Sequence, residues 1–529
     1  MIRSSRLWPL LVLSWLFPQH SAAQDTLAAA LEQLQRDGSI RVAGTLVRNS
    51  PLLQSFYAAR GQRAVWSSPA SREQLLAAVR SAAAEGLDPR DYHLAALEGF
   101  DTAAAAFDAL RTDALIRLAA HLFHGKLDPV DYLPEIDLQN TELGASAVQL
   151  LEDAIGKPDI PALLERLTPQ AEIYRRLKAG LAQYRAIEQR GGWGSVDDGP
   201  TLHPGDRSPR VAELRERLRR SADLRDPAPV TDTDLFDAAL EYATRHFQTR
   251  HQLDADGVVG KKTLAALNVP IRQRIEQIRV NLERARWLLH DLPASYVLVD
   301  IAGFSVHFVQ DGEELLRSRA VVGKPFRKTP IFRANISYLE FSPTWTVPPT
   351  ILRQDILPQI RKNPGYLASR NMRVLSFEGK EVDPASVDWS RYQGRNLPYM
   401  IRQDPGPENA LGRVKFMFPN QYHVYLHDTP SRNLFRQSER AFSSGCIRVE
   451  QAATLAKLLL ARQGWTPAQV DEALAGTRTR KVSLERPVPV LLYYWTVAIE
   501  DDGDILFKRD IYQRDAKLLQ ALDALEGSS

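Results

Sequence analysis

Cysteine is almost absent from this chain: among its 529 residues, Cys446 is the only one. A single cysteine excludes a disulfide framework within the chain. It also excludes a lipid anchor near the N-terminus, because that would need a cysteine at the processing site. A free cysteine is ordinarily a buried small hydrophobe. In an exported protein, however, a lone thiol is open to oxidation and to pairing between molecules, so we interpret Cys446 as a thiol retained for reaction.

Long hydrophobic runs are also lacking. Arg3 and Arg6 precede an apolar run at 7–17, which is followed by the small residues Ser21-Ala22-Ala23. This layout is typical of a secretory signal, and we predict a signal peptide over residues 1–23. The run is shorter than the roughly 18 apolar residues that a spanning helix needs, and no later segment reaches that length without charges. We expect a mature chain in the periplasm with no stable membrane span; an uncleaved signal that acts as an anchor stays open.

The chain has no marked excess of charge of either sign. Its 67 Lys and Arg residues nearly balance 64 Asp and Glu, which gives a formal net charge of +3. A net charge this small creates no electrostatic field that would favour a nucleic-acid partner, and we expect none. With 44% hydrophobic residues the chain can bury several cores, and its length suggests three or four domains.

The residue composition and the spacing of apolar residues change along the chain. Residues 24–195 are rich in Ala, Leu, Glu and Arg at helical spacing, which predicts a helical scaffold domain. The Gly-rich stretch 191–200 marks a boundary, and we predict a small helical module over 200–270 and a connecting helix over 271–294.

The last third is predicted to be mainly β. Short β-branched and aromatic runs indicate strands in a domain over 295–500: 296–301, 304–309, 319–322, 336–341, 421–426 and 488–498. The segment of about 348–419, with a helical pattern at 351–360, is too long for a plain connection and is predicted to be a capping insertion. Residues 501–529 form a C-terminal extension. The fold class is therefore multi-domain α + β.

An acidic and glycine-rich turn follows the second helix of the module. Calcium binding in the EF-hand manner is excluded, because Val258 and Ala265 stand where that loop needs oxygen ligands. The segment instead resembles a three-helix peptidoglycan-binding module in its Phe247-Gln248 helix end, its Asp-Gly-x-x-Gly turn at 256–260 and its Thr-x-x-Ala-Leu-Asn finish at 263–268. The same residues would also serve a scaffold that has lost binding.

Cys446 lies nineteen positions after the residue best suited to activate it. A cysteine nucleophile reacts as the thiolate, which is scarce at neutral pH unless a base assists. His427 follows a strand-like run and opens a turn, so it is the candidate base; His423 is the weaker candidate. The amides of Gly445 and Cys446 could donate to an oxyanion. Arg448 could bind a substrate carboxylate or order the loop, with a surface ion pair as the alternative.

The strings Tyr425-Leu426-His427-Asp428-Thr429-Pro430 and Ser444-Gly445-Cys446-Ile447-Arg448-Val449 resemble the catalytic signature of the L,D-transpeptidases with a YkuD-type domain. The usual pattern has His where this chain has Ser444. That departure occurs in the large multi-domain periplasmic branch, which carries an N-terminal helical scaffold, a peptidoglycan-binding module and a capping insertion. The resemblance is strong over about 295–500 and looser before it.

The resemblance implies a role for each site residue. Cys446 would be the nucleophile and His427 the general base and acid. The segment that holds Trp345 matches one near the family's cleft, although a core aromatic would look the same. The remaining assignments are Gly445 and Ser444 as residues that shape the site and the oxyanion pocket, and Arg448, Tyr425 and Trp345 as substrate-binding residues.

The implied reaction is a two-step acyl transfer on peptidoglycan. Cys446 would attack the third residue of a tetrapeptide stem and release D-alanine, and an amine of a second stem would resolve the thioester into a 3→3 cross-link. The resemblance implies no metal and no organic cofactor. Its partners would be peptidoglycan stem peptides and, in addition, periplasmic proteins of cell-wall synthesis.

Several alternatives remain open at this stage. With water as the acceptor the same site would be an L,D-carboxypeptidase, and with a protein amine it would attach an envelope protein to the wall. A non-enzymatic peptidoglycan-binding scaffold would tolerate loss of Cys446 or His427, yet both are present. A papain-like peptidase is disfavoured, because its histidine would follow the cysteine.

Overall fold

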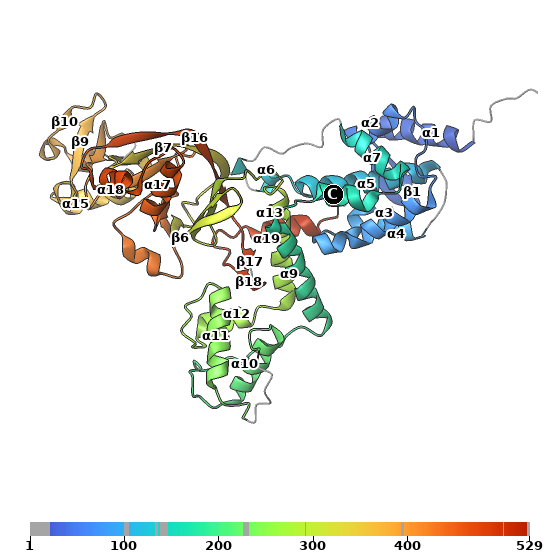
Figure 1. The fold of residues 1–529 in the computed structure, drawn as a ribbon, viewed down its shortest axis with the longest axis horizontal. Helices are drawn as coiled ribbons and strands as arrows, with labels where there is room; N and C mark the ends of the chain where they lie inside the picture. The colour runs from blue at the N-terminus through green and yellow to red at the C-terminus, as the bar shows by residue number, and fades with distance from the viewer. Residues whose placement is uncertain are drawn as a thin grey trace, which may run out of the picture.

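The computed structural model describes residues 22–99, 105–132, 136–137, 146–225, 232–290, 292–392, 396–500 and 502–525. Residues 1–21 of the predicted signal peptide lie outside these ranges. The described chain forms an N-terminal helical lobe, a small helical module and a large β domain, which meet at a helical stalk (Figure 1). Within the described ranges, no helix is both long enough and apolar enough to cross a bilayer.

The N-terminal lobe is mostly helical, as predicted. A short hairpin and a set of helices enclose one apolar core that includes Leu53, Phe56 and Leu110. The buried carboxylate of Asp108 accepts hydrogen bonds from the amides of Val65 and Trp66, which binds the central helix to a preceding loop. The elements are α1 (Ala22–Asp37), β1 (Ser39–Val42), β2 (Thr45–Arg48), α2 (Pro51–Ala59), α3 (Pro69–Ser81), α4 (Leu94–Gly99), α5 (Ala105–His124), α6 (Pro129–Tyr132), α7 (Ser146–Gly156) and α8 (Ile160–Leu167).

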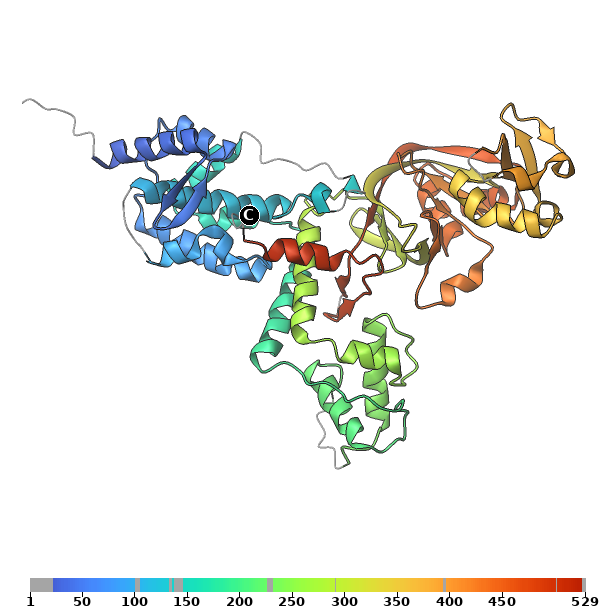
Figure 2. The same cartoon turned by 180° about the vertical axis from the view of Figure 1, so that it is seen from behind.

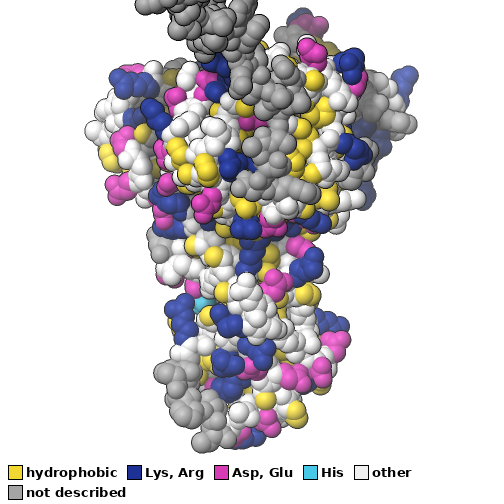
Figure 3. Space-filling view, turned by 90° about the vertical axis from the view of Figure 1, so that its right-hand side faces the viewer, with side chains coloured by type: hydrophobic (Ala, Val, Ile, Leu, Met, Phe, Trp, Pro, Cys, Tyr) yellow, Lys and Arg dark blue, Asp and Glu magenta, His cyan; other side chains and the backbone are white. Residues whose placement is uncertain are grey.

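Two long helices form the stalk between the lobes. Helix α9 (Glu172–Gln189) packs against α13 (Ile271–Arg286), and the small module hangs from their far ends (Figure 1). The predicted connecting helix is thus present as α13. Basic side chains on the module and stalk are interspersed with acidic ones (Figure 3), in keeping with the balanced charge of the chain.

The module consists of α10 (Pro209–Arg220), α11 (Ala238–Arg250) and α12 (Lys261–Leu267) around its own apolar core. The motif residues meet in space: the side-chain amide of Gln248 donates to the Asp256 carboxylate at 2.8 Å and accepts from the Gly257 amide at 2.8 Å. Gly257 has φ of +76°, a conformation that favours glycine. The three-helix arrangement expected from the motif is confirmed.

The C-terminal domain is built on a sheet that closes on itself. Its strands pair in the order β12-β13-β15-β6-β5-β4-β16-β7, and β7 also pairs with β12, which completes a ring. The ring strands are β4 (Tyr296–Asp300), β5 (Ser305–Gln310), β6 (Glu313–Gly323), β7 (Ile331–Phe341), β12 (Val414–Met417), β13 (Leu426–His427), β15 (Ile447–Val449) and β16 (Arg480–Tyr493). Helices α17 (Ala452–Ala461) and α18 (Pro467–Ala475) contribute to its core, β14 (Ala441–Ser443) pairs with β6, and β3 (Ile136–Asp137) of the N-terminal part adds to β7.

Between β7 and β12 the chain forms a separate lobe, which we call the cap (345–403). It holds a four-stranded sheet with its own apolar core. Its elements are β8 (Trp345–Thr346), α14 (Pro349–Ile351), a π-helix (Leu352–Ile356), α15 (Leu357–Lys362), α16 (Tyr366–Ser369), β9 (Met372–Ser376), β10 (Glu381–Val382) and β11 (Tyr399–Gln403). The insertion predicted for 348–419 therefore differs at both ends, because β8 already joins the cap sheet and β12 belongs to the ring.

One predicted strand is largely a loop. The run 421–426 has alternating side chains, but only Leu426 of it is in a strand. Asn420 explains the difference, since its side-chain carbonyl accepts from the amides of Tyr422 and Val424 and folds this stretch into turns. His423 consequently has a left-handed backbone, with φ of +54°.

The C-terminal segment returns to the centre of the molecule. Strands β17 (Val497–Ile499) and β18 (Ile505–Phe507) pair beside the stalk, and α19 (Asp515–Asp523) packs on α13 (Figure 2). Lys126 of the N-terminal lobe donates to the carbonyls of Leu522 and Ala524 at 2.9 and 2.8 Å. The segment predicted as an extension therefore joins all three lobes.

Candidate active site

The two motifs meet because their strands are neighbours. Strand β13 pairs in parallel with β15, with Leu426 opposite Ile447 and His427 opposite Arg448. Cys446 precedes β15 and so lies beside Tyr425, whose carbonyl accepts from the Ile447 amide at 3.1 Å. Directly paired residues face the same side of a sheet. Tyr425, His427, Cys446 and Arg448 therefore gather on one face.

The loop before Cys446 is held in a tight turn. The Ser443 hydroxyl donates to the Cys446 carbonyl at 2.6 Å and accepts from the Gly445 amide at 3.1 Å. Gly445 has φ of +118°, where a side chain would be strained. Its amide is thus already bonded within the loop, which differs from the expectation that it would serve an oxyanion.

A neighbouring segment supports this turn from below. Thr329 donates its hydroxyl hydrogen to the Gly445 carbonyl at 2.8 Å and accepts from the Gly323 amide. The buried hydroxyl of Tyr512 in turn accepts from the Thr329 amide at 3.0 Å and donates to the Gly323 carbonyl at 2.7 Å. Tyr512 of the C-terminal segment therefore supports the turn before Cys446 through Thr329.

The Cys446 thiol is half-buried and faces Tyr425. Burial raises the pKa of the thiol, and hydrogen bonds from the Tyr425 amide and hydroxyl oppose that rise. The thiol can also donate to the His423 carbonyl, 3.9 Å away. Since both Tyr425 donors favour the thiolate, this residue is placed to stabilise the sulfur when it carries charge.

Tyr425 joins the thiol to the cap. Burial first, and then the neighbouring Cys446, raise the pKa of Tyr425 well above its ordinary value, whereas a hydrogen bond with Trp345 lowers it. The Tyr425 ring also lies under the ammonium of Lys415, 4.4 Å from its centroid. Trp345, which sequence analysis placed near the cleft, packs against the cap core and contacts the site through Tyr425.

His427 is buried and held in one tautomer. Its Nδ1 atom lies 2.5 Å from the Asp428 carbonyl oxygen, which can only accept, so Nδ1 carries the hydrogen; the Leu411 backbone is a second hydrogen-bond partner of the ring. Burial, with repulsion from Arg448 and Lys415, lowers the pKa of His427 to about 3. The imidazole is therefore neutral at physiological pH and able to accept a proton.

Two cations flank the imidazole on the same sheet face. Lys415 and Arg448 stand opposite His427 on β12 and β15. Lys415 pairs with Glu340 at 3.5 Å, whereas no salt bridge to Arg448 occurs among the described residues. Burial lowers the pKa of Arg448, and its buried Nε makes no hydrogen bond. This guanidinium is thus available to an anionic group that enters the site.

Ser444 connects the cysteine loop to the cap through an arginine. The guanidinium of Arg327 donates to the Ser444 hydroxyl and to the Asp355 carboxylate, both at 2.6 Å, and to Gln354. Asp355 and Gln354 lie in the π-helix of the cap. π-helical turns are frequent at functional sites. The serine that departs from the usual pattern thus forms one end of a contact between loop and cap.

Sequence reasoning missed four residues that support the site: Lys415, Arg327, Thr329 and Tyr512. Lys415 had a usable signal, since it alternates with apolar residues in 414–417 and so had to face the polar side of the sheet. Thr329 and Tyr512 act through contacts with distant residues, which no local pattern reveals. Across the described ranges, no group of three or more acidic, His or Cys side chains is arranged to hold a metal.

Three family profiles match the chain. Residues 294–484 match the profile described as "L,D-transpeptidase catalytic domain". Residues 294–484 are thus similar to the YkuD-type catalytic domain of the L,D-transpeptidases. Residues 207–267 match a "Putative peptidoglycan binding domain" and residues 51–181 match a "Scaffold domain". The combination of L,D-transpeptidase domain, binding module and scaffold expected from the motifs is thereby confirmed.

The chain is also similar to known proteins named as L,D-transpeptidases. A protein of Haemophilus influenzae named "Putative L,D-transpeptidase" is 38% identical over 222 residues, which cover 42% of this chain and 45% of that protein. The chain thus spans less than half the length of this curated relative. Among solved structures, the L,D-transpeptidase of Stackebrandtia nassauensis is 13% identical with a TM-score of 0.21, covering 56% of this chain and 96% of that one. That of Mycobacterium smegmatis is 16% identical with a TM-score of 0.19, covering 38% and 59%. At these TM-scores the solved structures carry no argument about the candidate site, whose geometry comes from the strand pairing and contacts of this chain.

Proposed function

We propose that this protein is an L,D-transpeptidase that forms 3→3 cross-links in peptidoglycan through an acyl-enzyme on Cys446. The observation that supports the proposal is one sheet face that holds the Cys446 thiol with its two Tyr425 donors, the neutral imidazole of His427 and the guanidinium of Arg448, which has no salt bridge among the described residues. Export to the periplasm, where the polymer lies, agrees with the predicted signal peptide.

The first step forms a thioester. As the Cys446 sulfur attacks the carbonyl carbon of the third stem residue, its proton passes to Nε2 of His427, and the Tyr425 donors hold the developing charge on sulfur. The Cys446 amide is the remaining candidate donor to the oxyanion. When the bond to D-alanine breaks, His427 returns the proton to the departing amine. Arg448 would hold a carboxylate of the donor stem.

The second step transfers the acyl group. The side-chain amine of a second stem attacks the thioester carbonyl, gives up a proton to His427 and expels the sulfur, which is then reprotonated. The cap would exclude water from the thioester, since hydrolysis there would end in a shortened stem instead of a cross-link.

The test is the intact mass of the purified protein after incubation with a disaccharide-tetrapeptide. We expect a thioester adduct with loss of D-alanine in the wild type, no adduct in Cys446→Ala, and 3→3 dimers among the products. Products that are only disaccharide-tripeptides would replace the cross-linking proposal with a carboxypeptidase. A folded wild type with a reduced thiol but neither adduct nor turnover would overturn the acyl-enzyme and favour a wall-binding scaffold.

A further inference from the structure

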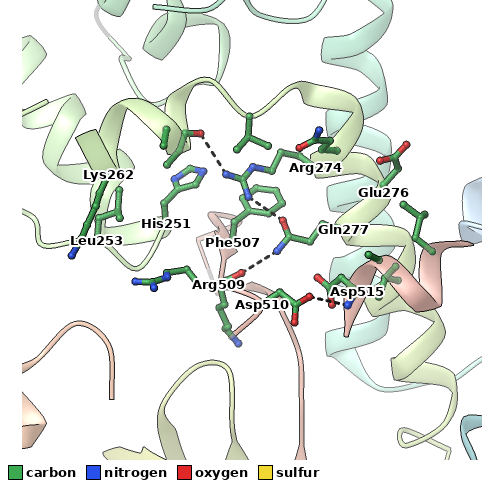
Figure 4. Close-up of a pocket in the computed structure, with 18 residues that line it drawn as sticks. His251, Leu253, Lys262, Arg274, Glu276, Gln277, Phe507, Arg509, Asp510 and Asp515 are labelled. Carbon is green, nitrogen blue, oxygen red and sulfur yellow. Dashed lines mark hydrogen bonds between the residues drawn. The ribbon is translucent and has the colours of Figure 1, made fainter. Parts of the chain in front are cut away.

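A large pocket lies away from the catalytic strands, where the module meets the stalk and the C-terminal segment. It has a volume of about 660 Å³ and is bounded by α12, α13, β18 and α19 (Figure 4). Its walls mix apolar groups, among them Leu253, Val280, Phe507 and Leu519, with charged ones. None of the motifs that define the transpeptidase site contributes to it.

The charges of the pocket are unevenly compensated. Glu276 pairs with Arg272 at 3.1 Å and Asp515 with Arg284 at 2.7 Å, whereas Asp510 accepts from neutral donors, among them the Tyr494 hydroxyl at 2.7 Å. Among the described residues, neither Arg274 nor Lys262 has a carboxylate partner. Both line the pocket, and Lys262 is exposed at its rim.

Arg274 is the decisive group. Its guanidinium lies over the Phe507 ring, 4.6 Å from the centroid, and reaches only the neutral acceptors Gln277 and Ala266 (Figure 4). Its Nε is buried without a hydrogen-bond partner. Burial, with repulsion from Arg250, lowers the pKa of Arg274 to about 10. A half-buried cation with a buried, unbonded Nε and no counter-ion is unfavourable, and an anion in the pocket would compensate its charge.

We propose that this pocket binds the carboxylate of a short aliphatic peptide, of the kind that a peptidoglycan stem presents. Arg274 and Lys262 would form the subsite that binds the carboxylate. The inference rests on the proposed function for the choice of peptide. The apolar walls suit alanine side chains, and the volume accommodates a few residues. Since the pocket spans module, stalk and C-terminal segment, a bound stem would fix the module relative to the catalytic domain.

The test is hydrogen exchange of the full-length Cys446→Ala protein with and without disaccharide-tetrapeptide, because this protein binds donor without consuming it. We expect slower exchange in peptides covering 262–280 and 507–519. In Arg274→Gln this protection should require roughly tenfold to hundredfold more ligand, the loss expected for a charge-assisted hydrogen bond. Lys262→Ala, at an exposed position that cannot disturb folding, should weaken it less. Lys261→Ala, the exposed neighbour of Lys262 that does not line the pocket, is the matched control.

The outcomes separate this site from the catalytic one. Protection confined to the catalytic strands, or equal in Arg274→Gln and Lys261→Ala, overturns the pocket as a peptide site. Equal protection by acetate at the same concentration would also overturn it, since it would show a general anion site. With Cys446 restored, turnover of the soluble tetrapeptide should persist in Arg274→Gln; loss of turnover in the wild type itself would count against the proposed function and not against the pocket.

Discussion

At the scale of single residues, the resting site holds a neutral thiol beside a neutral imidazole. Burial raises the pKa of Cys446 and lowers that of His427, so an ion pair between them is not the resting state. In the proposed mechanism such a pair would react only when substrate arrives and proton transfer accompanies attack, and the neutral thiol would resist oxidants between turnovers.

Tyr425 is expected to set the reactivity of the thiol. In Tyr425→Phe the hydroxyl donor to sulfur is lost, so the pKa of Cys446 should rise by about one to two pH units, the worth of a hydrogen bond to a charged group. The measurement is the rate of alkylation by iodoacetamide from pH 6 to 10. Tyr422→Phe, on the same loop, is the control, and a profile that coincides with the wild type would contradict the role.

His427 should make the protein less stable in acid. Because its folded pKa of about 3 lies below the unfolded value near 6.5, the unfolded chain binds more protons between these values. Stability contributed by the neutral imidazole is complete above pH 6.5 and is lost as the pH falls toward 3. Between pH 7.5 and 4.5 the loss from this group is about 2–3 kcal/mol. Denaturant unfolding of His427→Gln should show a pH dependence smaller by that amount; an unchanged dependence would refute it.

At the scale of elements, the contact of Arg327 with the cap and with Ser444 connects two parts that the chain separates widely. We expect Arg327→Gln and Asp355→Asn each to lower the rate of acyl-enzyme formation by about tenfold, because the cap would lose its charged contact with the cysteine loop.

A double-mutant cycle gives the sharper measurement. If the pair acts as a unit, the double variant should be little worse than either single one. Lys362→Ala, exposed on the next helix of the cap, is the control, and additive losses in the double variant would show that the two residues act separately.

The sequence predicted many of these elements correctly, and the failures have physical causes. The alternation in 296–301 and 304–309 predicted β4 and β5, and the pattern in 351–360 predicted the helices of the cap. The strand predicted for 421–426 was largely wrong, because the Asn420 side chain accepts a hydrogen bond from the Tyr422 amide, which a strand would need for pairing. Ring closure escaped prediction altogether, since the pairing of β7 with both β16 and β12 depends on residues far apart in the chain. His427 ends β13 and Cys446 directly precedes the adjoining β15, while their catalytic roles remain predictions.

At the scale of the whole molecule, the C-terminal segment links the three lobes to the site. Arg250 of the module donates to Asp223 at 2.6 Å, to the Tyr184 hydroxyl of the stalk at 3.1 Å and to the Ile505 carbonyl of β18 at 3.2 Å. Further along the same segment, Tyr512 supports the turn before Cys446. The position of the module and the shape of the turn before Cys446 therefore both depend on the C-terminal segment that holds Ile505 and Tyr512.

Tyr512→Phe tests this dependence with a single atom. Loss of the hydroxyl leaves the Thr329 amide and the Gly323 carbonyl without a partner, which should cost about 1–3 kcal/mol of unfolding free energy and slow acylation of Cys446. Both are measured on the full chain, by denaturant unfolding and by adduct formation. Tyr132→Phe, at the edge of the N-terminal lobe, is the control. Stability lost without any change in acylation would show that the turn does not depend on Tyr512.

Ring closure also bears on how the protein reaches its native state. Val297 of β4 pairs with Val490 of β16, 193 positions later, and Ile336 of β7 pairs with Val488 of the same strand. A chain that emerges from its N-terminus first can fold the scaffold early, but the ring cannot close until β16 has emerged. Until then β4 and β7 present open edges to other emerging chains. Completion of the candidate site therefore depends on the last strand of the ring, so this site forms only in chains that are nearly complete.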